Sequence, residues 1–162
     1  MTKEVSIRTA RLTDAPTIAE LTIQLGYEVP LSTLTDRLGR LLAKDDQQFL
    51  VAEIDGDVVG WVHVGLTENI DTGVYAHIGG LVVDRRHRKE RIGRLLMTEA
   101  EAWARGRSCD VVRLWSTVSR TDAHRFYEHL GYTNVKTQYS YVKLIGSAGN
   151  EAIRAFIPRV NP

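Results

Sequence analysis

An apolar run followed by a strongly basic turn lies in the second half of the chain. Leu81-Val82-Val83 precede the segment Arg88-Lys89-Glu90-Arg91-Ile92-Gly93-Arg94, which opens a predicted helix. A strand that leads into such a turn collects free backbone N–H groups, the positive end of a helix dipole and several guanidinium groups. This arrangement predicts an anion site suited to phosphate. The alternative is a solvated run of charges, because charged first turns are common and no known phosphate-loop motif is present.

A second candidate is Tyr127, within the segment Ala123-His124-Arg125-Phe126-Tyr127-Glu128-His129-Leu130-Gly131-Tyr132. A tyrosine hydroxyl can donate a proton to a leaving group of high proton affinity, and a short helix that ends at a sheet can fix its geometry. The alternative for Tyr127 alone is a half-buried core residue whose ring packs and whose hydroxyl finds a hydrogen bond.

The histidines and the single cysteine do not predict a metal site. No two histidines are spaced i, i+4 on a predicted helix, and no HExxH motif occurs. His77 differs from the others because it lies on a strand that leads toward Gly79-Gly80, where it could act as a base near neutral pH. The alternative is a strand histidine that faces solvent or a neighbour. Cys109 is interpreted as a small buried apolar residue.

Composition limits the class of protein. The 162 residues are 43% hydrophobic and 25% charged, with a formal net charge of +1, so bulk electrostatics would not hold nucleic acid or an anionic membrane. One cysteine excludes an intramolecular disulfide framework and favours a cytoplasmic location. We find neither a signal-peptide pattern nor an apolar run of membrane-spanning length, and therefore expect no export by a standard signal and no membrane partner.

The hydrophobic periodicity predicts one domain over residues 1–145, followed by a tail at 146–162 that we leave unassigned. Asp55-Gly56 between two apolar runs predicts a hairpin, and Gly79-Gly80 predicts a bulge or a close approach to the backbone. The order of elements predicts an α/β fold with a mixed sheet. Predicted strands are Val5 to Arg8, Phe49 to Ile54, Val58 to Leu66, Tyr75 to Val83, Val111 to Trp115 and Tyr132 to Leu144; predicted helices follow Asp14, Leu31, Arg91 and Arg120.

Two of these segments, in their order and spacing, resemble the GCN5-related N-acetyltransferase (GNAT) family. The first runs from Ile78-Gly79-Gly80-Leu81-Val82-Val83-Asp84 through the basic turn, and the second from Ala123 to Tyr132, similar to the family's FYexxGF segment. The resemblance covers Val5 to about Lys143. It implies a mostly antiparallel sheet flanked by helices, with a V-shaped splay between the Tyr75 to Val83 strand and the Val111 to Trp115 strand.

The resemblance also implies acetyl-CoA as acyl donor, bound in that splay. The strand backbone at Leu81, Val82 and Val83 would meet the pantetheine, and the pyrophosphate would lie on the loop. The loop positions are Arg88, Lys89, Glu90, Arg91, Ile92, Gly93 and Arg94. Tyr127 occupies the family's position for the acid that protonates the departing thiolate. The implied reaction is direct transfer of the acetyl group to a primary amine of a small molecule or peptide, without a metal.

Three positions depart from the family pattern. Arg91 stands where the loop commonly has its first glycine, and a side chain there would hinder the close approach that glycine permits. His77 stands where many relatives carry a glutamate base, and water-mediated deprotonation is an alternative to it. Arg120 replaces an asparagine that often contacts the cofactor, and its guanidinium could reach a CoA phosphate.

The acceptor site in this family is built largely from the first two helices and a strand loop, which implies Tyr27, Glu28 and Glu68 as substrate-binding residues. Glu28 and Glu68 could attract a cationic amine, but they could equally be ordinary loop residues. The alternative function is a non-catalytic acyl-CoA-binding or sensor domain with the same fold. We also expect a homodimer, because many relatives pair through late strands.

Overall fold

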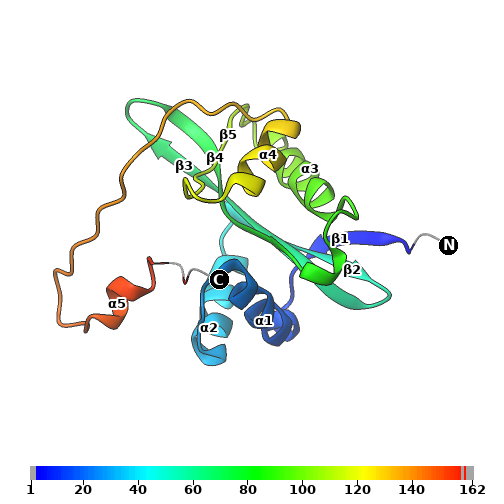
Figure 1. The fold of residues 1–162 in the computed structure, drawn as a ribbon, viewed down its shortest axis with the longest axis horizontal. Helices are drawn as coiled ribbons and strands as arrows, with labels where there is room; N and C mark the ends of the chain where they lie inside the picture. The colour runs from blue at the N-terminus through cyan, green and yellow to red at the C-terminus, as the bar shows by residue number, and fades with distance from the viewer. Residues whose placement is uncertain (1–2, 158, 160–162) are drawn as a thin grey trace. The chain divides into compact units, whose positions relative to one another are not determined.

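The computed structural model describes residues 3–157 and 159. The chain forms two compact units, Met1–Leu114 and Trp115–Pro162. The first unit contains a sheet with helices on both faces, and the predicted α/β fold with a mixed, mostly antiparallel sheet is confirmed (Figure 1).

The sheet of the first unit has the order β1-β2-β3-β4-β5. The first four strands pair antiparallel, and β5 runs parallel to β4. Among the described residues, that parallel pairing joins only Ala76 to Val112 and His77 to Arg113. β4 therefore continues from Ile78 onward without β5 beside it. The strands are β1 (Val5–Thr9), β2 (Gln47–Ile54), β3 (Asp57–Asn69), β4 (Gly73–Val83) and β5 (Val112–Arg113).

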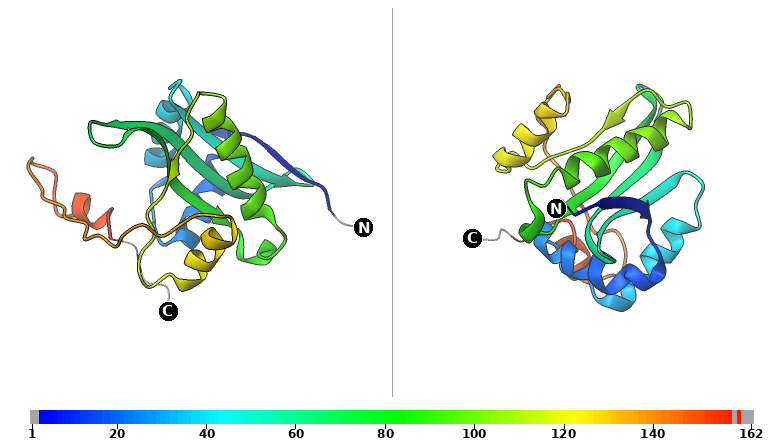
Figure 2. Two further views of the ribbon diagram at one scale, coloured as in Figure 1. Left: turned by 90° about the horizontal axis from the view of Figure 1, so that it is seen from above. Right: turned by 90° about the vertical axis from the view of Figure 1, so that its right-hand side faces the viewer.

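Helices cover the two faces of the sheet (Figure 2). On one face lie α1 (Ala15–Leu25) and α2 (Leu31–Leu42), which come after the short turn η1 (Leu12–Asp14). Their buried Ile18 and Leu38 pack in one cluster with Trp61 of the sheet. On the other face lies α3 (Ile92–Arg105), preceded by the turn η2 (Arg85–His87). Its Leu96 is fully buried.

An irregularity in the β3–β4 pairing confirms the prediction made from Gly79-Gly80. His63 pairs with Gly80 and Val64 pairs with Ile78, so Gly79 is one extra residue in β4, a β-bulge. A side chain also approaches each glycine. A Cβ at Gly79 would lie 2.6 Å from His63 Nδ1, and one at Gly80 would lie 2.7 Å from the ring of Trp61. Both interpretations of the glycine pair are therefore correct.

The second unit contains α4 (Thr121–His129) and the short α5 (Glu151–Arg154) within the predicted tail. Gly131 has a φ of 94°, as expected for a glycine just beyond the end of a helix. The prediction of a strand from Tyr132 to Leu144 is wrong, because these residues form neither strand nor helix. Tyr139 and Tyr141 are 91% and 89% exposed. Alternating apolar residues form a strand only when a neighbouring backbone pairs with them, and the structure gives this segment no such neighbour among its described residues.

Within the part of the chain that the structure describes, none of the helices combines the length and the apolar character needed to cross a lipid bilayer.

Candidate functional site

The loop between β4 and α3 begins with a buried carboxylate. The Asp84 side chain, in a residue only 5% exposed, accepts hydrogen bonds from the backbone N–H of Arg86 at 3.0 Å and from its guanidinium at 2.7 Å. The amide oxygen of Gln24 on α1 accepts from the backbone N–H of Arg85. These contacts fix the start of the loop to the body of the unit. The Arg86 hydrogen bonds lower the pKa of Asp84 from 3.8 to about 2.

This pKa shift predicts a pH-dependent contribution to stability. Because the folded pKa lies below the unfolded value of 3.8, the contribution is complete above about pH 4 and disappears as the pH falls through about 2. We expect Asp84→Asn to unfold at lower urea concentration than wild type at neutral pH, and the difference to shrink across this window. Urea unfolding at several pH values measures it, with the exposed Asp36→Asn as the matched control. A difference in urea midpoint between wild type and Asp84→Asn that stays constant with pH would contradict a lowered pKa of Asp84.

The rest of the loop adopts an unusual backbone. Lys89 and Arg91 have φ angles of 70° and 64°, in the left-handed region that favours glycine. Arg91 is the N-cap residue of α3, and its side chain makes no capping hydrogen bond. The first-turn N–H groups of α3 are thus not capped by that side chain, and the sequence around them is rich in basic residues. The anion site that the sequence predicts at Arg88 to Arg94 remains a prediction.

The left-handed conformation of Arg91 predicts the effect of restoring a glycine. A non-glycine residue in this region costs about 1 kcal/mol, so Arg91→Gly should raise the free energy of unfolding by about that amount. For a chain of this size we expect a rise in Tm of about 2–4 °C. The matched control is Arg88→Gly, because Arg88 has an ordinary φ of −65° and loses the same charge. Calorimetry of both variants separates the effect of backbone strain on Tm from the effect of the lost charge. Equal shifts in Tm for the two variants would refute strain at Arg91 as the cause.

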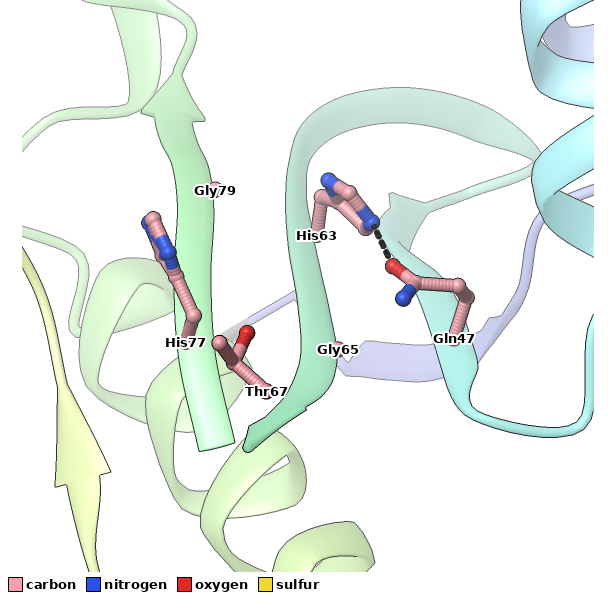
Figure 3. Close-up of a pocket in the computed structure, with 6 residues that line it drawn as sticks. All are labelled: Gln47, His63, Gly65, Thr67, His77 and Gly79. Carbon is pink, nitrogen blue, oxygen red and sulfur yellow. Dashed lines mark hydrogen bonds between the residues drawn. The ribbon is translucent and has the colours of Figure 1, made fainter. Parts of the chain in front are cut away.

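His77 lies on β4 opposite Gly65 of β3. Burial, and after it the positive charge of Arg113, lower its pKa below 6.5. An imidazole in this state is unprotonated at neutral pH and can accept a proton. His77 is one of six residues that line a cavity of about 160 Å³ on the sheet (Figure 3). The lining consists of Gln47 from β2, His63, Gly65 and Thr67 from β3, and His77 and Gly79 from β4.

The second histidine of the cavity, His63, is held in place by Gln47 and Phe49. Its Nε2 lies 2.7 Å from Gln47 Oε1, and its ring stacks on Phe49 with 5.8 Å between centroids (Figure 3). Burial lowers the pKa of His63 to about 4, and the charges of His77 and Lys44 add to that effect. His63 is therefore neutral at physiological pH.

The second unit contains the predicted acid, Tyr127, on α4. Its ring makes edge contacts with Phe126 and Tyr132, at 5.2 and 5.9 Å between centroids. Burial raises the pKa of Tyr127, and the charge of Arg120 at the start of α4 opposes that shift. The structure thus brings Arg120 and Tyr127 into electrostatic contact within one unit, and keeps the phenol protonated at neutral pH.

The three predicted acceptor residues do not line the cavity. Tyr27 and Glu28 lie between α1 and α2. Glu68 is exposed near the end of β3, and because side chains alternate along a strand it projects to the face opposite Thr67. Their assignment to the acceptor remains a prediction.

Sequence reasoning missed Gln47, His63 and Thr67. The available signal was the alternation in β3, where His63, Gly65 and Thr67 share one face of the strand. Adding His77 to that face needs the pairing of Gly65 with His77, which depends on the length of the β3–β4 turn and on the bulge. Neither is readable from composition or spacing.

Proteins of similar sequence are named as acetyltransferases. A model of the acetyltransferase (GNAT) family matches residues 16–132. An uncharacterized N-acetyltransferase of Methanocaldococcus jannaschii is 29% identical over 107 residues, which are 65% of this chain and 47% of that protein. The match thus spans about half of that relative's length. An N-alpha-acetyltransferase of Sulfurisphaera tokodaii is 30% identical over 148 residues, which are 86% of each protein.

Among solved structures, the fold is similar to that of an aminoglycoside N-acetyltransferase in complex with CoA. The TM-score is 0.80 at 17% identity, over 88% of this chain and 97% of the other. At this identity the likeness concerns the fold alone.

Proposed function

This chain belongs to the GNAT family of acetyltransferases, and from that premise we propose that it transfers the acetyl group of acetyl-CoA directly to a primary amine of a small molecule or peptide. The observation that carries the proposal is the continuous path from β4 through the basic loop into α3. β4 continues from Ile78 to Val83 beyond the two residues that pair with β5. The basic loop after β4 then leads into α3.

The residues of this region fit acetyl-CoA. The backbone of Leu81, Val82 and Val83 would pair with the amides of its pantetheine arm. A diphosphate would take hydrogen bonds from N–H groups of the loop and of the first turn of α3, with charge from the loop arginines. The loop residues are Arg88, Lys89, Glu90, Arg91, Ile92, Gly93 and Arg94. The left-handed backbone at Lys89 and Arg91 supports this role, because such turns direct successive N–H groups toward an anion.

Acetyl-CoA supplies the acetyl thioester, and the chain supplies a base and an acid. As the amine nitrogen forms its bond to the carbonyl carbon, the carbon–sulfur bond breaks and the sulfur takes the electron pair. His77 accepts the proton that the nitrogen loses, and Tyr127 donates a proton to the sulfur. The products are an N-acetyl amide and the free thiol. The lowered pKa of His77 and the raised pKa of Tyr127 each favour the protonation state that its role needs.

Further assignments belong to the same proposal. Residues 1–145 act as one acetyltransferase domain, with Arg120 toward a phosphate of the cofactor. Tyr27, Glu28 and Glu68 contact the body of the acceptor, outside the cavity that contains His77. A homodimer in the cytoplasm is the proposed state of the protein.

Calorimetric titration with acetyl-CoA, followed by a free-thiol assay with a panel of amines, tests the function. Saturable binding with amine-dependent thiol release is the expected result. Binding without release for any amine would favour the sensor alternative. An absence of binding would overturn the proposal, and Arg91 would then be the first residue to examine.

A further inference from the structure

Two buried side-chain atoms in the described part of the chain have no hydrogen-bond partner within it, the Nε1 of Trp61 and the Oγ of Ser116. Buried polar groups are nearly always paired, because an unpaired one keeps the cost of leaving water without a compensating bond. In a protein that binds a ligand, such an atom can be paired by the ligand. Each of the two atoms is therefore a candidate ligand contact.

The position of Trp61 does not connect its N–H group to a ligand. The ring lies 5.0 Å from that of Phe49 between centroids, in the hydrophobic cluster with α1 and α2. A Cβ at Gly80 would lie 2.7 Å from carbon atoms of the six-membered ring of Trp61. This part of the indole, and not Nε1, is thus the part next to β4.

Ser116 lies in the connection between β5 and α4, and hydrogen bonds hold this connection to the helix. The backbone oxygen of Thr117 accepts from the backbone N–H of Arg120 and from Nε2 of His124, both at 3.0 Å. His124 and Tyr127 are three residues apart, so they share a face of α4. The residue after Ser116 is therefore attached to the helix face that carries Tyr127, and all of these residues belong to the second unit.

The proposed reaction determines which part of acetyl-CoA would come close to Ser116. Tyr127 is the proposed proton donor to the sulfur, and a short ethylene link joins that sulfur to the nearest amide of the pantetheine arm. A hydroxyl beside Tyr127 would then meet either the sulfur or this amide. Sulfur is a weak hydrogen-bond acceptor, whereas an amide oxygen is a strong one. The amide is thus the group that compensates best for an unpaired buried hydroxyl.

We propose that Ser116 is a further cofactor-binding residue, whose hydroxyl donates a hydrogen bond to the oxygen of the pantetheine amide nearest the sulfur. The inference rests on the proposed acetyltransferase function and adds to it a cofactor contact from the second unit. The hydroxyl is unpaired in the free protein and paired in the complex. It therefore lowers the stability of the free protein and raises the affinity for acetyl-CoA.

The stability of the free protein gives the first test. Because Ser116→Ala removes an unpaired buried hydroxyl, we expect the Tm of the free protein to rise by about 2 °C. Ser119→Ala is the matched control, since Ser119 is exposed in the same connection and its replacement should leave Tm unchanged. An unchanged or lower Tm for Ser116→Ala would mean that its hydroxyl already has a partner in the free protein, and would overturn the inference.

Calorimetric titration with CoA and its parts gives the second test. Ser116→Ala should raise the Kd of acetyl-CoA and of CoA about fivefold, the effect of one neutral hydrogen bond, because both molecules contain the amide. The Kd of the nucleotide part of CoA, which lacks the pantetheine arm, should not change. Ser116→Cys keeps the size of the side chain but has only a weak donor, so it should raise the same two Kd values.

The outcomes separate the two proposals. An unchanged Kd of acetyl-CoA in both Ser116 variants, or an equal rise for the nucleotide part, would overturn this inference and leave the acetyltransferase function standing. A fall in kcat at unchanged Kd would place the hydroxyl at the sulfur and would equally contradict the amide contact. A wild-type protein that binds neither acetyl-CoA nor CoA would overturn both proposals.

Discussion

Replacement of Tyr127 by phenylalanine is expected to lower kcat about 100-fold, toward the lower end of the range for general-acid catalysis. The loss results from the proton that the departing sulfur would no longer receive from the phenol. The ring contacts with Phe126 and Tyr132 should survive, because phenylalanine keeps the ring. The Kd of acetyl-CoA should change less than about twofold, since a loss confined to kcat marks an interaction made in the transition state. Steady-state kinetics with titration calorimetry measures both quantities.

Tyr139→Phe is the matched control for this variant. Tyr139 is 91% exposed in the same unit, so its hydroxyl has no proposed role and kcat should stay at the wild-type value. If Tyr127→Phe keeps full kcat while acetyl-CoA binds normally, Tyr127 is not the acid. A parallel rise in Kd would instead indicate that the hydroxyl serves binding.

The second large effect on kcat is expected from replacement of His77. In His77→Gln, kcat should fall about 100-fold at neutral pH, because the side chain that we propose as the acceptor of the amine proton is gone. The pH profile gives a separate signature. Burial and Arg113 lower the pKa of His77 below 6.5, so wild-type kcat should be independent of this residue above that pH and should decline as the pH falls through the lowered value. The variant should lack this acid limb.

His124→Gln is the control for this pair of measurements. The ring of His124 bonds the backbone oxygen of Thr117, and no role in the reaction is assigned to it. Wild-type kinetics are expected from this variant at every pH. If His77→Gln retains both the rate and the acid limb, a water chain removes the proton and another group titrates.

The elements that sequence predicted correctly are those whose signal is local. The Asp55-Gly56 turn between apolar runs indicated the β2–β3 hairpin, and Asp55 and Gly56 do have positive φ angles. The basic loop and the helix after it were predicted because strand, charge and helix start come one after another in sequence. The sequence showed that Arg91 replaces a glycine, but only the structure shows that Arg91 adopts the left-handed backbone that glycine favours, with a φ of 64°.

The features that sequence did not predict depend on pairing between distant segments. The run from Tyr132 to Leu144 has the alternation of a strand, yet a strand also requires a partner backbone, which alternation does not encode. The cavity likewise needs β2, β3 and β4 in one register. His63 resembles, in isolation, an ordinary strand residue, and only the contact with Gln47, 16 residues away, gives it a defined tautomer.

The extra residue at Gly79 reverses which residues of β4 face each side of the sheet. Before it, odd-numbered residues of β4 such as His77 share a face with Gly65; after it, even-numbered residues such as Gly80 and Val82 share the same face. Insertion or deletion of one residue there would change the composition of β4 by one residue only, but it would exchange the two faces of the sheet for every residue on one side of it. In a homologue that lacks the extra residue and keeps the pairing of Gly80 to Val83, the neighbours of His77, and not His77 itself, would lie on the face of Gly65.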